Sequence, residues 1–71
     1  MSQEEFLLKM QEEVLDTDAA VSMETRLTDV DWDSLAFVSF IAMANTAAGK
    51  KVDRAALKKA ATVGELYALL R

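Results

Sequence analysis

A single serine, Ser34, stands where a polar and acidic stretch gives way to a long apolar one, within Asp31-Trp32-Asp33-Ser34-Leu35. The residues after it suit a helix, so the sequence predicts an exposed hydroxyl beside a helix N-terminus. The unpaired N–H groups and partial positive charge of such a terminus favour any anion attached to the serine, a phosphate ester included. Ser34 is therefore the position at which we expect chemistry to occur.

Composition restricts that chemistry. The chain has no cysteine and no histidine. It therefore has neither disulfides nor thiolate metal ligands, and it lacks the side chain most often used as a general base near neutral pH. A pair of carboxylates for acid–base catalysis has no identifiable cleft or electrophile to work with. We expect a protein that is not itself an enzyme.

Charge is unevenly spread along the chain, whose net charge is −4. Residues 1–34 hold ten acids against two basic residues, a net charge of −8, and residues 35–71 hold two acids against six basic residues, a net charge of +4. The basic residues of the second part are Lys50, Lys51, Arg54, Lys58, Lys59 and Arg71. Nucleic-acid binding depends on clustered basic residues, so this acidic chain predicts no nucleic-acid partner. A partner protein with a basic surface is favoured instead.

The chain shows no targeting or membrane segment. No uninterrupted apolar run reaches the length of about 18 residues that indicates a membrane helix. The N-terminus, Met1-Ser2-Gln3-Glu4-Glu5, is acidic, whereas a secretory signal begins basic and continues apolar. No proline-rich or low-complexity stretch marks a linker. We expect a cytoplasmic monomer that does not enter membranes, folded as one domain over residues 1–71.

The predicted first helix covers residues 3–15. Ser2 followed by Glu5 fits a capping box, in which the two side chains satisfy backbone N–H groups of the first turn. Apolar residues recur on one face at intervals of three and four. They are Phe6, Leu7, Met10 and Val14. Residues 16–33 then lose this periodicity, which predicts a long loop with a short helical turn, a kind of segment that is often functional.

The predicted central helix covers residues 34–48. Asp33 is a good N-cap, and Gly49 stands where a left-handed C-terminal cap would lie. The helix is apolar almost all round, and a small bundle cannot bury so much apolar surface. The residues expected in the core are Phe40, Ile41 and Ala44. The residues expected to form an exposed apolar stripe after Ser34, suited to docking, are Leu35, Val38 and Ala42.

Two shorter helices complete the predicted fold. Asp53 caps a helix that runs through about Lys59 and has Leu57 as its main apolar contact. Thr62 and Glu65 form a second capping box, which opens the last helix. No segment shows the alternation of a β-strand. The sequence predicts an all-α protein, a small four-helix bundle with three main helices, a short third helix and a long loop between the first two.

Two other interpretations attach to the residues around the start of the central helix. Asp29, Asp31 and Asp33 alternate as in the opening of a calcium-binding loop, but Ser34 and Phe40 stand where that loop requires glycine and glutamate. A calcium site is therefore disfavoured. Ser34 alternatively does no more than help to cap the helix. The choice between a capping serine and a chemically used one depends on the rest of the chain.

The rest of the chain resembles a known family over nearly its whole length. Asp33-Ser34-Leu35, at the head of the second helix and after an acidic loop, resembles the attachment motif of acyl carrier proteins and their peptidyl carrier relatives. Three further segments occur in the order and spacing of that family. They are Leu27 leading through Thr28-Asp29-Val30-Asp31-Trp32 into the motif, the Lys50-Lys51-Val52-Asp53 step after the second helix, and Thr62-Val63-Gly64-Glu65-Leu66 at the last helix.

The resemblance implies that Ser34 receives a 4′-phosphopantetheine arm from coenzyme A, added by a separate phosphopantetheinyl transferase that supplies magnesium. Acyl intermediates would travel on the terminal thiol as thioesters, between acyl-transferring or acyl-activating enzymes. Asp33 would cap the helix and help the transferase to position Ser34, and Leu35 and Val38 would contact partners. An acyl chain that folds back between helices would find room beside small side chains, which equally allow closer helix packing. These are Ala42, Ala44, Ala47 and Ala48.

The chain departs from fatty-acid carriers along the second helix. Those carriers line its exposed side with carboxylates, whereas no acid lies between Asp33 and Asp53 here. The loop acids Asp29 and Asp31 would then attract basic partners while the apolar stripe supplies contact. We expect a carrier for specialised fatty-acid or polyketide-type biosynthesis. The alternatives are an aminoacyl or peptidyl carrier and an unmodified helical adaptor that binds its partner through the apolar stripe.

Overall fold

Helices dominate the structure, a computed structural model that describes residues 1–70 and leaves Arg71, one of the basic residues counted above, outside the described residues. The elements are α1 (Gln3–Lys9), a π-helical segment η1 (Met10–Val14), a 3-10 turn η2 (Leu27–Asp29), α2 (Ser34–Ala48), α3 (Arg54–Lys59) and α4 (Val63–Ala68). Residues 1–70 form no strand beyond an isolated bridge that joins Arg26 to Thr62. The prediction of a small all-α four-helix bundle is confirmed.

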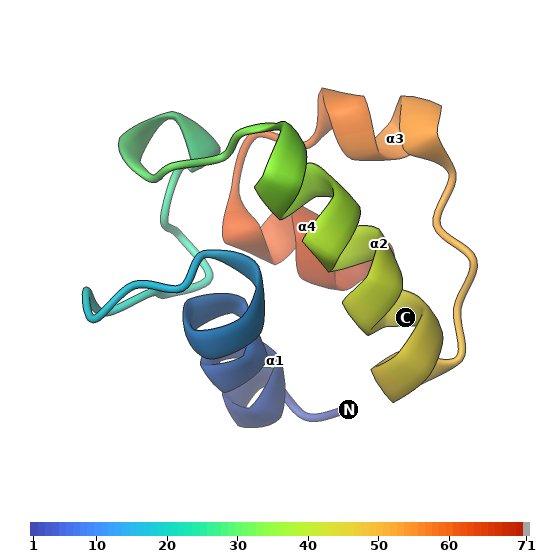
Figure 1. The fold of residues 1–71 in the computed structure, drawn as a ribbon, viewed down its shortest axis with the longest axis horizontal. Coiled ribbons are helices and arrows are strands. Elements are labelled where there is room, and N and C mark those ends of the chain that lie inside the picture. Colours follow the sequence, from blue (N-terminus) through green and yellow to red (C-terminus); the bar gives the residue numbers. More distant parts are fainter. Residues whose placement is uncertain (71) are drawn as a thin grey trace.

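The helices surround one apolar core. In Figure 1, α2 crosses the front of the molecule, with α1 to one side, α4 behind it and α3 near its beginning. Aromatic rings join these elements, since Phe6 of α1 lies edge-on to Phe40 of α2 at 6.3 Å between centroids and tilted against Tyr67 of α4 at 5.0 Å. The buried residues are Phe6, Met10, Val14, Leu27, Ala36, Phe40, Met43, Ala44, Leu57, Val63, Leu66 and Leu70. Phe40 and Ala44 are thus buried as predicted, whereas Ile41 is only half-buried at the edge of the core.

The first helix differs from the prediction in its winding. Ser2 Oγ accepts the Glu5 N–H (3.2 Å) as the capping box requires, and the helical segment ends at Val14, one residue before the predicted end. Its second half is π-helical, which fits one extra residue into the turn. Met10 and Val14 are buried there, and η1 packs against α2. The chain then leaves the helix through Asp16, whose positive φ of 48° is one that aspartate tolerates better than most residues.

The long loop over residues 16–33 is tied to the connection between α3 and α4. The three backbone bonds run from Leu27 N–H to Ala61 O (2.9 Å), from Val63 N–H to Thr25 O (2.9 Å) and from Gly64 N–H to Met23 O (2.8 Å). Gly64 permits the last of these, because a Cβ at that position would lie 2.8 Å from the Met23 carbonyl oxygen. Leu27 is buried beside these bonds. The loop therefore reaches α2 along a fixed course.

The helices α2 and α3 begin and end at the predicted residues, and α4 begins after the predicted cap at Thr62. α2 has the predicted bounds, and Gly49 follows it in the left-handed conformation (φ 63°). The Ala55 N–H donates to Asp53 Oδ1 (3.2 Å) at the start of α3, whose Leu57 is fully buried. No helix within residues 1–70 is both long enough and apolar enough to cross a membrane.

Candidate functional site

The N-terminus of α2 is capped by the residue before Ser34. Asp33 has an extended backbone (φ −102°, ψ −172°), and its Oδ1 accepts the Ala36 N–H (2.9 Å) while its carbonyl accepts the Phe37 N–H (3.0 Å). The N–H groups of Ser34 and Leu35 belong to the first turn, where a helix offers no partner of its own. Partial positive charge therefore remains at this end of α2, directly beside Ser34.

Ser34 is the first residue inside α2 and is exposed. Its hydroxyl makes no side-chain hydrogen bond to another residue of the described chain, whereas the capping bond comes from Asp33. The side-chain cap of α2 is therefore made by Asp33, and the structure does not support a capping role for the Ser34 hydroxyl. The hydroxyl is free to react and lies where a helix stabilises negative charge.

Trp32 fixes the chain just before this hydroxyl. Its ring packs against Phe37 (6.3 Å between centroids, 60° between planes) and against Phe40 (6.1 Å, 69°), in the edge-to-face geometry that aromatic pairs prefer. Its backbone N–H donates to the Val30 carbonyl (2.8 Å). Since Phe40 is fully buried, Trp32 links the segment that precedes Ser34 to the core.

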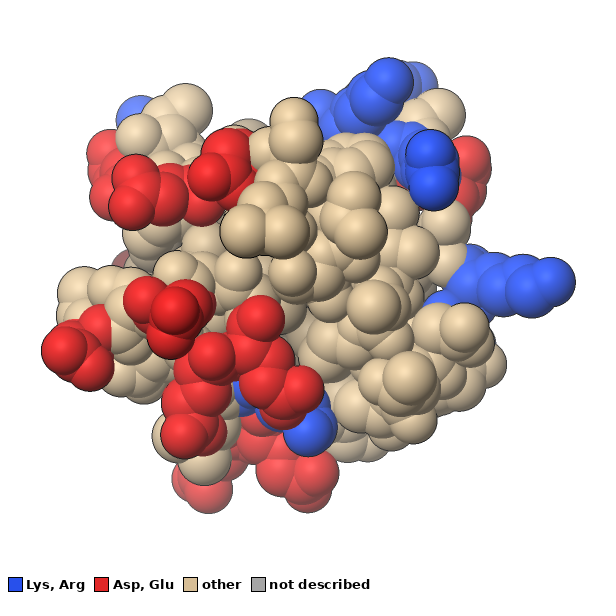
Figure 2. Space-filling model, in the orientation of Figure 1, with Lys and Arg blue, Asp and Glu red and all other residues tan. Residues whose placement is uncertain are grey.

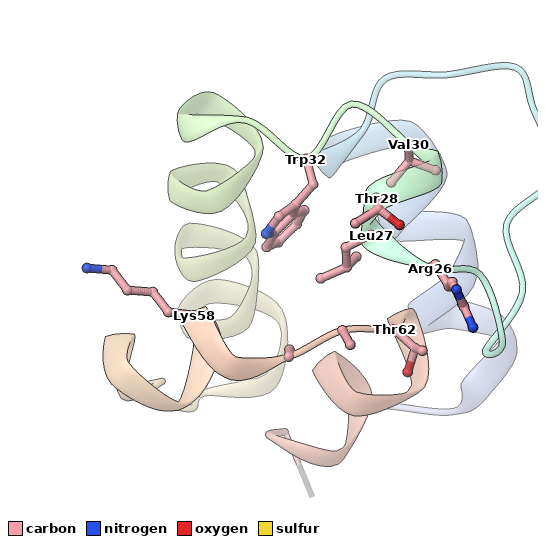
Figure 3. A pocket seen from close by; sticks show the side chains of 9 residues that line it. Arg26, Leu27, Thr28, Val30, Trp32, Lys58 and Thr62 are labelled. Atoms are coloured by element: carbon pink, nitrogen blue, oxygen red, sulfur yellow. The ribbon is translucent and has the colours of Figure 1, made fainter.

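Ser34 opens onto a pocket of about 510 Å³ between the start of α2 and α3, here named the α2–α3 pocket. It is lined by Trp32, Asp33, Ser34, Phe37, Val38 and Lys58. A second pocket of about 780 Å³, here named the loop pocket, lies between η2 and the connection from α3 to α4 (Figure 3). Trp32 and Lys58 line both pockets, so they form the wall between them. Both pockets arise from packing between distant segments, and the sequence predicted neither.

The predicted docking residues lie on one exposed side of α2. Leu35 and Val38 are 74% and 58% exposed, and Ala42 is exposed one turn further along. Asp29 and Asp31 are exposed in the loop that leads into the helix. Figure 2 shows carboxylates gathered on one side of this face and basic residues at the other, with uncharged surface between them. Ser34 is the first residue of α2, and no residue of that helix is charged.

The loop carboxylates do not come together as a metal site. Within residues 1–70 the structure holds no group of three or more aspartate or glutamate side chains placed to bind a metal ion. Asp33 instead uses its carboxylate to cap α2. This arrangement does not support the calcium interpretation of Asp29, Asp31 and Asp33.

The four alanines of α2 that were considered as lining for an acyl chain do not surround an interior space. Of these four alanines, Ala42 and Ala47 are exposed, Ala48 is half-buried at the edge of the core, and Ala44 alone is fully buried. Ala44 is fully buried in that core, beside Phe40. The space beside Ser34 lies on the α3 side of the helix instead. Lys58 and Phe37 were not singled out as site residues from sequence, because no local pattern shows which side of α2 the short α3 will cover.

The geometry is that of a presented hydroxyl, and the sequence matches a family that modifies one. Residues 5–70 match the family model described as "Phosphopantetheine attachment site". No curated protein and no solved structure gives a significant match to the chain.

Proposed function

The chain belongs to the phosphopantetheine attachment family, and on that premise we propose that Ser34 carries the 4′-phosphopantetheine arm of an acyl carrier protein. Carriers of this family hold the arm covalently, receive it from a phosphopantetheinyl transferase and interact with biosynthetic enzymes. They are in general not catalytic themselves. The proposal concerns the residue that is modified, the residues that partners contact and the type of cargo.

The four serines of the chain differ in how their hydroxyls are used, and this difference carries the proposal. The Ser2 and Ser22 side chains accept backbone N–H bonds at 3.2 and 3.3 Å. Ser39 is half-buried in the interior of α2, beyond the first turn. Ser34 alone combines an exposed hydroxyl with the positive end of a long helix. It is the serine best suited to bear a phosphodiester.

The attachment forms one bond and breaks one. Ser34 Oγ bonds to the phosphorus that bears the pantetheine group, the phosphoanhydride P–O bond of coenzyme A breaks, and the nucleotide half leaves with the electron pair. The hydroxyl proton passes to a base of the transferase, because this chain has no histidine and Asp33 is already engaged as a cap. The role of this chain is to hold Ser34 in place for the transfer.

The residues around Ser34 fit the arm. A phosphodiester at the N-terminus of α2 gains about 0.3–1 kcal/mol from the helix dipole at an exposed site. Phe37 and Val38 give the α2–α3 pocket an apolar wall directly beside the attachment point. When bound, the arm supplies a terminal thiol that holds an acyl group as a thioester. A chain without cysteine acquires a reactive sulfur in this way.

Partner enzymes have two kinds of contact surface near the arm. Leu35, Val38 and Ala42 offer an apolar stripe that begins next to the attachment point. Asp29 and Asp31 offer exposed negative charge on the approach to it, which attracts basic surfaces. Asp33 adds a contact for the transferase, in addition to its cap. In this proposal, the acidic loop attracts the partner enzyme and the apolar stripe of α2 then makes the contact.

The uncharged exposed side of α2 favours a specialised pathway. No acid lies on this helix, so partners cannot recognise it through the carboxylates that a fatty-acid carrier offers there. Partners selected for apolar contact suit specialised fatty-acid or polyketide-type biosynthesis. The same feature makes an aminoacyl or peptidyl carrier the second candidate. Loading by acyl-activating enzymes, and not by amino-acid-activating enzymes, would support the first.

Intact-mass measurement tests the attachment. The protein is incubated with coenzyme A, magnesium and a broad-specificity transferase, and it should gain the mass of one arm. Ser34→Ala should gain none, while the matched Ser39→Ala should gain one arm like the unchanged protein. No gain with several transferases would contradict the carrier function. A gain that survives Ser34→Ala would move the attachment to another residue.

A further inference from the structure

The α2–α3 pocket is lined by a cation as well as by Ser34, the proposed attachment residue. Lys58 of α3 and Ser34 of α2 line the same pocket although 23 positions separate them in the chain. Figure 3 shows the Lys58 side chain extending from α3 away from Leu27 and Thr62, so its ammonium points out of the loop pocket. Lys58 thus lines both pockets, and its ammonium points away from the loop pocket.

The ammonium of Lys58 has no carboxylate partner within the described chain. The ion pair recorded among residues 1–70 joins Lys9 to Glu13 (3.1 Å) at the other side of the molecule. Asp33 is the acid that lines the α2–α3 pocket, and its Oδ1 accepts the Ala36 N–H. Lys58 is therefore available to a second anion in this pocket.

A cation in this pocket would stabilise an anion attached to Ser34. A phosphodiester on Ser34 Oγ carries one negative charge and stands next to the carboxylate of Asp33, which repels it. The helix dipole offsets part of that repulsion, and a cation on the facing wall offsets more. Lys58 supplies this cation from α3.

We infer that Lys58 holds the phosphodiester of the arm and so directs the arm into the α2–α3 pocket, against Trp32. The inference rests on the attachment at Ser34 proposed above. It names an anchoring role for a residue of α3, which neither the attachment motif nor the docking stripe contains. An exposed ion pair changes an equilibrium by about 1.5- to 5-fold, so loss of the Lys58 charge should reduce occupancy of the pocket by that factor.

Trp32 is the reporter for the test, because it is the only tryptophan of the chain and lines the pocket. The experiment compares the unchanged protein, Lys58→Gln and Lys59→Gln, each before and after arm attachment verified by intact mass. Lys59 is the matched control, since it lies on the same helix, carries the same charge and borders a different pocket. Quenching of Trp32 fluorescence by neutral acrylamide measures whether the arm covers the ring.

Attachment should lower the quenching constant of Trp32 in the unchanged protein and in Lys59→Gln, and the protection should be smaller in Lys58→Gln by the same factor of about 1.5 to 5. Added salt should weaken the protection in the first two proteins and leave the third unchanged, because exposed pairs are screened. Equal protection in all three proteins, or none in the unchanged one, would overturn the role of Lys58. Absence of any mass gain would overturn the attachment proposal as well, so the two failures are distinguishable.

Discussion

The helices α2 and α4 both begin after an extended N-cap, yet one start is closed and the other is open. At α4, Thr62 Oγ1 accepts the Glu65 N–H (3.2 Å), and the Glu65 carboxylate accepts the Ala61 N–H (2.6 Å). The first helical residue, Val63, is fully buried. The α4 start is thus neutralised by its own side chain and covered by the core.

The start of α2 has only half of this arrangement. Asp33 caps one N–H, no glutamate or glutamine follows in the first turn, and the first helical residue is the exposed Ser34. The start of α4 is thus satisfied by reciprocal caps and buried, whereas the start of α2 leaves Ser34 and Leu35 exposed. Substitutions at the α4 start should therefore mainly lower the unfolding free energy, whereas substitutions at the α2 start should mainly affect arm attachment.

The largest loss of stability should come from the closed start. Gly64→Ala forces a Cβ to within 2.8 Å of the Met23 carbonyl oxygen, so the loop must shift away from α4. Such overpacking costs about 1–3 kcal/mol of unfolding free energy. Urea denaturation measures it as a lower midpoint with an unchanged slope. An unchanged midpoint would show that the loop is not held against α4.

The next largest effect should come from removing either N-cap side chain, Thr62 of α4 or Asp33 of α2. Thr62→Ala and Asp33→Ala should each lose about 1 kcal/mol of unfolding free energy, because each removes one capping bond. Only the change at Asp33 should slow arm attachment. Asp33→Asn is the matched control, since asparagine caps as well as aspartate while it removes the charge.

The rate of arm attachment to Asp33→Asn, compared with that of the unchanged protein, shows whether the charge or the cap matters. If Asp33→Asn keeps the stability and still slows the mass gain, the transferase uses the carboxylate. If attachment proceeds at the unchanged rate, Asp33 acts through the cap alone.

A smaller effect should follow from attachment itself. The phosphodiester adds negative charge at the open start, which should raise the unfolding free energy by about 0.3–1 kcal/mol at low salt. The gain should shrink as salt is added, because the site is exposed. Urea denaturation of the protein with and without its arm measures this difference. A decrease in stability on attachment would mean that repulsion from Asp33 outweighs the helix dipole and Lys58.

The smallest effect should be that of Ser34→Ala. The hydroxyl makes no side-chain hydrogen bond within the described chain, so its removal should change the unfolding free energy by less than about 0.5 kcal/mol. The same variant should abolish arm attachment. A loss comparable to that of Thr62→Ala would show that Ser34 does contribute to the cap, and the contrast between the two helix starts would fail.

Local signals explain why much of the fold was predictable. The bounds of α2 follow from Asp33 and Gly49, whose capping preferences operate within one turn of the chain. The N-cap bonds of the predicted capping boxes at α1 and α4 are likewise short-range, and both form. Such features depend on residues three or four positions apart, so the sequence contains all that is needed to locate them.

Features that depend on distant segments were not predictable. The π-helical turn at Met10–Val14 forms where η1 packs against α2, and no residue type specifies it. The position of Lys58 depends on how α3 folds over the start of α2. Ala42 was correctly expected on the exposed side of α2, yet the same small residues gave no guide to where a pocket forms. The motif located Ser34, and tertiary packing determined its surroundings.

The separation of charge in Figure 2 gives the molecule a preferred orientation in the electric field of a partner. Acidic residues of the N-terminal half and basic residues of α3 lie on opposite sides of the uncharged face, so a partner's field exerts a torque on the whole carrier. A partner with the opposite pattern turns the carrier before the surfaces touch. Because α2 carries no charged residue of its own, such a rotation would orient this helix through the charges of neighbouring segments.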